Sequence, residues 1–167
     1  GEHQDYLDLP VISMGISLHS MIKGHLREDR KVVIYKVDLD EVETFSLDDL
    51  LYDHEKNYYK SGIKICIQEG IQFSKGFEVE VESNIPIQSG CGSSSSIMVA
   101  WIYFLTQIVD NPMKWNLDKI SRLAYAAEVL EFDEPGGMMD HYSSAFGGLI
   151  YLEIKPTISI KKINYPF

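Results

Sequence analysis

Residues 89–96 read SGCGSSSS, a run of small residues between a strand-like segment and a long apolar segment. The run could be a tight turn in which a serine caps the helix that follows. It could also be a phosphate-binding loop, because small residues let backbone N–H groups close on an anion and the positive end of the next helix points at the same place. A flexible linker fits less well, since both flanks have the composition of a core.

Two carboxylates further along the chain are unusual for their surroundings. Glu128 lies at the edge of an apolar stripe with helical spacing, so it needs either a cationic side chain, an arginine or a lysine, or a metal ion. Asp140 follows two glycines and two methionines. It could be a general base on a glycine-supported turn or an ordinary helix N-cap. Glu131 and Glu134 have the pattern of solvated charges.

The first six residues, GEHQDY, place Glu2, His3 and Asp5 within four positions. Such a cluster can hydrogen-bond the hydroxyls of a polyol. Similar clusters are also common on protein surfaces, where charged residues are mostly found. No single one of these groups of residues specifies a function.

Positioning these residues requires both strands and helices. Alternation of apolar residues with glutamates predicts a strand over 76–83 with one face toward solvent. Further strands are predicted over 10–19, 31–39, 43–47, 147–154 and 159–163, and helices over 48–70, 93–110 and 117–132, with a short helix after the PGGMMD turn. Because strands and helices do not alternate strictly, the pattern favours an α+β domain with a mixed sheet over a doubly wound parallel sheet.

The composition narrows the class of protein. A chain of 167 residues, 45% of them hydrophobic, fits one domain with a proper core. The formal net charge of -10 argues against a nucleic-acid partner, and no apolar run is long enough to span a membrane. Two cysteines, Cys66 and Cys91, make no disulfide framework and indicate reduced thiols in a cytoplasmic protein. The chain begins within a motif and stops soon after a predicted strand, so we expect it to be cut at both ends.

Three segments together, GEHQDY, PIQSGCGSSSS and EPGGMMDH, resemble in order and spacing the galactokinase branch of the GHMP kinase superfamily. The first resembles the galactokinase signature, the second the nucleotide loop and the third the turn that carries the catalytic aspartate. The resemblance covers most of residues 1–154. It implies that residues 1–167 form the superfamily's N-terminal domain, a ribosomal protein S5 domain 2-like α+β fold. That fold has a mixed sheet of about five strands with helices mainly on one face.

The resemblance also implies roles for individual residues. Asp140 would act on the anomeric hydroxyl of a sugar, as a base or as a charge stabiliser. Ser94, or else Ser93, would hold Mg²⁺ together with Glu128. Residues that would bind ATP are Ser89, Gly90, Cys91, Gly92, Ser93, Ser94, Ser95 and, more loosely matched, Tyr59; residues that would bind the sugar are Glu2, His3, Asp5 and Gly137.

Several departures from the galactokinase pattern put galactose itself in doubt. The family's arginine six residues before the first glutamate falls upstream of residue 1, and its third motif and C-terminal domain are missing from the chain. Leu9 stands in place of glycine and His141 in place of glutamine, while Cys91-Gly92 is closer to the general superfamily loop. The residues needed for phosphoryl transfer are nevertheless present.

Three classes of function follow. The first is the N-terminal domain of an ATP-dependent sugar kinase, which would be inactive without its C-terminal domain, because phosphoryl transfer depends on positioning and charge neutralisation. The second is a non-catalytic sensor of sugar and ATP with a galactokinase-like fold. The third is a structural fragment that binds nothing tightly. The presence of Ser94, Glu128 and Asp140 favours the kinase.

Overall fold

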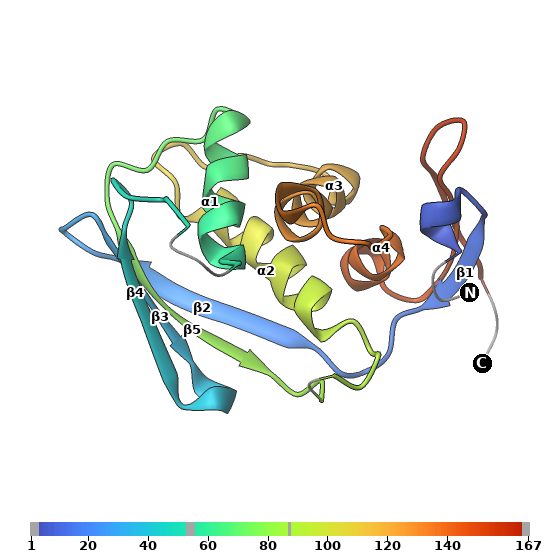
Figure 1. The fold of residues 1–167 in the computed structure, drawn as a ribbon, viewed down its shortest axis with the longest axis horizontal. Coiled ribbons are helices and arrows are strands. Elements are labelled where there is room, and N and C mark those ends of the chain that lie inside the picture. The colour runs from blue at the N-terminus through green and yellow to red at the C-terminus, as the bar shows by residue number, and fades with distance from the viewer. Residues whose placement is uncertain (1–3, 53–55, 87, 165–167) are drawn as a thin grey trace.

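A four-stranded sheet forms one layer of the molecule in the computed structural model, which describes residues 4–52, 56–86 and 88–164 (Figure 1). Its strands lie in the order β2 (Ser20–Leu26), β5 (Phe77–Ser83), β3 (Lys31–Lys36) and β4 (Glu41–Ser46). The β5–β3 pair is parallel and the other two pairs are antiparallel, so the sheet is mixed.

The helices α1 (Tyr58–Gln68) and α2 (Ser93–Gln107) cover one face of this sheet (Figure 1). The strand sequence explains why only one face is covered. In β5 the apolar residues Phe77, Val79 and Val81 are buried, whereas Glu80 and Glu82 point to the exposed face. The predicted strand over 76–83 is therefore confirmed, and its period of two sets the side on which the helices pack.

The centre of α2 carries the largest buried side chain of the core. Trp101 is fully buried and contacts the rings of Phe77 and Phe104 at centroid distances of 5.8 Å. Together with the apolar residues of α1 it fixes the height of α2 above the sheet. The N-terminus of α2 is thereby held in place for the loop that precedes it.

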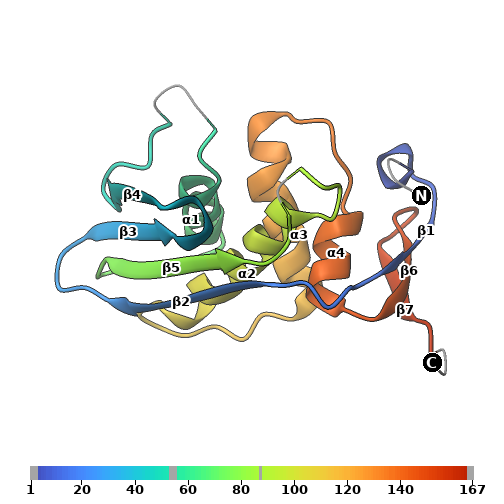
Figure 2. The ribbon, with the colours of Figure 1, turned by 90° about the horizontal axis from the view of Figure 1, so that it is seen from below.

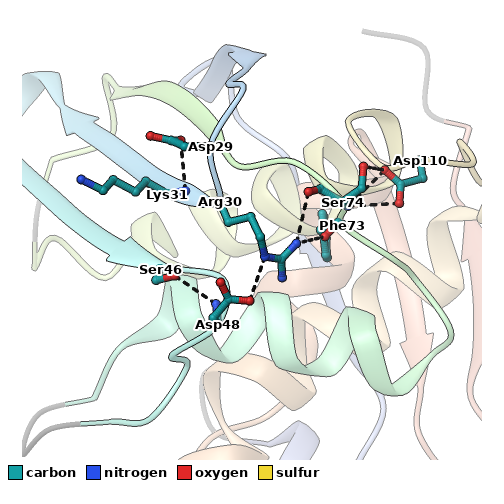
Figure 3. Close-up of polar contacts among 8 residues, drawn as sticks. All are labelled: Asp29, Arg30, Lys31, Ser46, Asp48, Phe73, Ser74 and Asp110. Atoms are coloured by element: carbon teal, nitrogen blue, oxygen red, sulfur yellow. Dashed lines mark hydrogen bonds and ion pairs between the residues drawn. The ribbon is translucent and has the colours of Figure 1, made fainter.

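A polar network fixes the opposite end of α2 (Figure 3). Arg30 donates to Asp48 at 2.8 Å and to the carbonyl of Phe73 at 2.7 Å. The adjacent Ser74 donates through its hydroxyl, at 2.6 Å, to Asp110 just beyond α2. These bonds connect the β3–β4 hairpin, the approach to β5 and the end of α2.

Beyond the sheet and its two helices, α3 (Leu117–Glu128) and α4 (Met139–Phe146) lead to a second, three-stranded sheet. This antiparallel sheet has the order β1 (Val11–Met14), β6 (Leu149–Glu153), β7 (Ser159–Lys162). Figure 2 shows the chain running from β1 in one sheet directly into β2 in the other. A small core of Val11, Tyr142, Ile150 and Leu152 joins α4 to this second sheet.

The α+β class, the mixed sheet and the one-sided helix cover are confirmed, but the strand count and most element boundaries differ from the prediction. Within the described residues, seven strands form two sheets rather than one sheet of about five. The strand predicted over 10–19 is confined to Val11–Met14 and ends where its partner β6 begins, since Met14 pairs with Leu149 and the preceding Gly147 and Gly148 both have positive φ angles. Residues 20–26, between the strands predicted over 10–19 and 31–39, form β2.

The observed helices α1, α2 and α3 are shorter than the segments that the apolar pattern predicts. The helix expected over 48–70 starts only at Tyr58, where the side chain of Asn57 accepts from the backbone N–H of Lys60 at 2.8 Å. The helix predicted over 117–132 starts at Leu117 as expected, where Asn116 caps it by accepting a 2.8 Å bond from the N–H of Lys119. Within the described ranges no helix has the length and apolar character needed to cross a bilayer.

Gly62, in the middle of α1, is expected to be required for packing despite its poor helix propensity. A Cβ atom there would lie 2.6 Å from Cδ1 of Trp101, which is fully buried. We predict that Gly62→Ala lowers the free energy of unfolding, because overpacking costs about 1–3 kcal/mol and outweighs a gain of about 1 kcal/mol in helix propensity. Urea unfolding measures the difference, with the exposed Gln68→Ala of the same helix as control. A more stable Gly62→Ala protein would contradict this account.

Candidate functional site

The loop between β5 and α2 presents an uncapped helix N-terminus. Gly90 and Gly92 have φ angles of +72° and +67°, a left-handed conformation that glycine adopts at little cost. Gly92 is the N-cap of α2, and no side chain caps the helix. The serine-capped turn considered from the sequence is therefore not formed. The first N–H groups of α2 remain directed toward the loop, where they favour an anion.

Asp140 faces this loop from the first turn of α4. A Cβ atom on Gly92 would lie 3.2 Å from Cγ and 3.3 Å from Oδ2 of Asp140, so only glycine allows this close approach. The N-cap of α4 is Met138, and the N-cap role considered for Asp140 is therefore wrong. The structure thus brings together the second and third motifs of the sequence.

A cavity of about 660 Å³, a volume usual for small-molecule sites, opens beside the loop and Asp140. Its walls come from the β1–β2 connection, the loop, one side of α2 and one side of α4. Polar groups on these walls that the sequence did not single out are Ser13, His19, Ser20, Ser96, Tyr103, Ser143 and Ser144. Of these residues, Ser143 could have been found from the sequence, because it lies three positions after Asp140 and therefore on the same side of a helix.

Glu128, the last residue of α3, is buried and hydrogen-bonded to His141, whose Nε2 atom lies 2.7 Å from Oε2 of the carboxylate. Burial by itself would raise the pKa of Glu128, but the contact with His141 and smaller contributions from Ser94 and Ser95 outweigh it, so the net pKa lies below the usual value. The partner of Glu128 is a histidine rather than the arginine or lysine considered from the sequence.

Ser94 and Glu128 supply the donor atoms that a magnesium ion prefers. Both present oxygen, and Mg²⁺ is commonly held by one or two carboxylates with phosphate and water oxygens completing its shell. Among the residues that the structure describes, no group of three or more His, Cys, Asp and Glu side chains could hold a metal by itself. A cation here would thus depend on the oxygens of a bound phosphate, and the donor set fits that arrangement.

Asp5 connects the first motif to the third. It is 4% exposed, and its Oδ2 atom accepts from the backbone N–H of Met139 at 2.7 Å. A side chain on Gly137 would collide with this carboxylate, which explains the second glycine of the turn. Glu2 and His3, predicted to bind sugar, lie outside the described residues.

Tyr59 does not join these residues. Its ring packs edge-on against Trp101 at 5.1 Å and does not line the cavity. Burial and the nearby Glu43 carboxylate raise the pKa of Tyr59, as expected for a core tyrosine. Tyr59 as an adenine-binding residue therefore stays a prediction.

The two glutamates expected to be solvated are also partnered. Glu131 accepts from the hydroxyl of Tyr52 at 2.7 Å and pairs with Lys64 at 2.9 Å, while Glu134 pairs with Lys56. The Lys64 bond connects α1 to the turn after α3, and the Tyr52 bond connects the segment before α1 to the same turn. They stabilise the helix pair that carries Glu128.

The sequence is similar to that of known sugar kinases. A galactokinase of Clostridium perfringens is 30% identical over 154 residues, which cover 88% of this chain and 39% of the relative. The chain therefore spans about two fifths of the length of such relatives.

The fold is that of solved kinase structures. Methanococcus jannaschii mevalonate kinase superposes with a TM-score of 0.82 at 23% identity, covering 99% of this chain and 52% of that one. Lactococcus lactis galactokinase complexed with galactose superposes with a TM-score of 0.81 at 24% identity, covering 99% and 45%.

The family description "GHMP kinases N terminal domain" matches residues 57–148, more than half of the chain. This match includes the loop, Glu128 and Asp140, and it agrees with the resemblance read from the three motifs. The chain belongs to the GHMP kinase N-terminal domain family.

Proposed function

We propose that this chain is the nucleotide- and substrate-binding part of an ATP-dependent sugar kinase, which transfers the γ-phosphate of ATP to the anomeric hydroxyl of a sugar. The observation that carries the proposal is the position of Asp140, whose carboxylate lies against Gly92 at the uncapped N-terminus of α2 and lines the adjacent cavity. A base and an anion site are thus in direct contact.

On the donor side, the backbone N–H groups from Gly90 to Ser94 and the positive end of α2 would bind the phosphates of ATP. Ser94 and Glu128 would hold Mg²⁺, which neutralises the charge of the phosphates when bound. Glu128 is suited to this because its lowered pKa keeps it ionised.

On the acceptor side, the cavity beside Asp140 would receive the sugar. Asp140 would accept the proton of the attacking hydroxyl or stabilise its developing charge. Asp5, through Met139 N–H and the Gly137 backbone, holds the turn that carries Asp140. The galactokinase name of the relatives supports a hexose, while Leu9 and His141 leave the identity of the sugar to experiment.

The remainder of the polypeptide is the natural partner of this chain, since relatives are more than twice as long. It would supply a second wall that excludes water from the cavity. We therefore expect the full-length protein to be active and the 167-residue chain alone to transfer phosphate slowly.

Nucleotide binding at the loop can be tested by measuring how fast each of the two cysteines is chemically labelled. Cys91 is exposed in the loop, whereas Cys66 is buried, and burial raises the pKa of the Cys66 thiol to about 12. Because thiolates are the reactive form, iodoacetamide should label Cys91 and spare Cys66. We predict that MgATP slows the labelling of Cys91 at least about fivefold, measured by mass spectrometry, as expected from occupancy of the loop. Cys91→Ser is the control, and labelling indifferent to MgATP would count against this site.

The role of Asp140 predicts a loss of rate without a loss of nucleotide binding. In the full-length protein Asp140→Asn should lower kcat by about 10²–10⁴-fold, because a base acts in the transition state. The Kd for ATP, measured by calorimetry, should change by less than about threefold. Glu82→Gln, which removes an exposed carboxylate of β5 that does not line the cavity, is the control. A protein that binds sugar and ATP but never turns over, with or without Asp140, would indicate the sensor instead.

Glu128 should affect turnover more than sugar binding. Glu128→Gln keeps the shape of the side chain but removes its charge, so kcat should fall by about 10²-fold or more while the KM for the sugar stays nearly constant. Steady-state kinetics at saturating magnesium measure both quantities. Unchanged turnover would mean that Glu128 serves only as the buried partner of His141.

A further inference from the structure

We propose that His141 is a positioning residue for the cation site: its Nε2–H holds one oxygen of Glu128 so that the other oxygen stays directed toward the divalent cation. This inference rests on the proposed function of Glu128. It gives a role to a histidine that does not line the cavity beside Asp140.

The geometry of the pair is well defined. His141 is 1% exposed and lies in α4, and its Nε2 atom is 2.7 Å from Oε2 of Glu128 in α3. The ring of Tyr125 packs edge-on against the imidazole, with centroids 5.6 Å apart. A ring enclosed in this way cannot change rotamer without disturbing the helix packing, so the direction of its N–H is fixed.

The second ring nitrogen indicates which tautomer is present. Nδ1 of His141 is buried and has no hydrogen-bond partner among the residues that the structure describes. A proton on Nδ1 would be an unpaired buried donor, which is costly, whereas a proton on Nε2 finds the carboxylate. A ring with its proton on Nε2 is therefore the form that fits. Its single polar role in the described structure is to donate to Glu128.

His141 Nε2 makes the one side-chain hydrogen bond to the Glu128 carboxylate that the described residues define, while Ser94 and Ser95 make smaller contributions to lowering its pKa. The imidazole is held rigidly by packing, while the serine hydroxyls can rotate. Ser94 is itself a proposed ligand and would turn its oxygen toward the cation. The donor from His141 is therefore the one that can keep the carboxylate oriented when the cation binds.

His141 also follows Asp140 directly in α4. Asp140 approaches Gly92, while His141 reaches Glu128. The first turn of α4 thus places the base and the support of the cation ligand with one rigid element.

A matched pair of amide variants of the full-length protein tests the proposal. The amide nitrogen of glutamine can take the place of Nε2, whereas the amide of asparagine is one methylene too short to reach Glu128. With the non-hydrolysable analogue AMPPNP bound, Mn²⁺ affinity is measured by electron paramagnetic resonance. We expect His141→Asn to weaken Mn²⁺ binding about tenfold or more and His141→Gln to stay within about threefold of the parent. Apo melting temperatures are recorded for each variant, and binding is compared well below the lowest one.

The Glu128→Gln background supplies the control. There, adding His141→Asn should cause no further loss of Mn²⁺ affinity, because the effect of His141 passes through the carboxylate. Equal affinity in the asparagine and glutamine variants, whether both are unchanged or both weakened, would overturn the positioning role and leave the proposed function standing. A parent complex that binds no Mn²⁺ with AMPPNP would overturn the proposed function, and this inference with it.

Discussion

The close approach of the first turn of α4 to the N-terminus of α2 is the contact on which the candidate site depends. Gly92 permits it, since any side chain at that position would meet the Asp140 carboxylate. Gly92 and Asp140 both line the adjacent cavity, and the next residue of α4, His141, contacts Glu128. The proposed base, anion site and cation ligand are thus positioned by the packing of three helices rather than by loops alone.

A phosphate bound at this place would need a cation beside it. Two carboxylates, Glu128 and Asp140, lie around a helix terminus that favours phosphate, in a chain whose formal net charge is -10. A phosphate group placed among them would be repelled unless a positive charge intervened. The contact with His141 lowers the pKa of Glu128 despite its burial, which suits the proposed role of a metal ligand.

The two sheets position different helices of the candidate site. The mixed sheet, with the Trp101 core above it, fixes the height and direction of α2. The three-stranded sheet packs through Tyr142 and Val11 against α4, so it fixes the element that carries Asp140 and His141. Gly15, at the crossing between the sheets, packs on the backbone of Gly147 and connects the two halves.

Local sequence determined the features that depend on neighbours in the chain. The alternation in residues 77–83 specified the strand and its buried face, Asn116 specified the start of α3, and the glycines of the loop specified a backbone that can bind an anion. The three motifs, taken together, also predicted the family. Each of these signals rests on backbone conformation or on contacts within a few residues.

Tertiary structure alone decided which side chains meet. Asp5 reaches Met139 across 134 positions, Glu128 finds His141 rather than an arginine, and Tyr59 packs into the core instead of lining the cavity. The break between β1 and β2 likewise lies where Gly15 meets Gly147 from the far end of the chain. The sequence could not predict these outcomes, because they depend on the angles at which helices and sheets pack, and no periodic pattern encodes those angles.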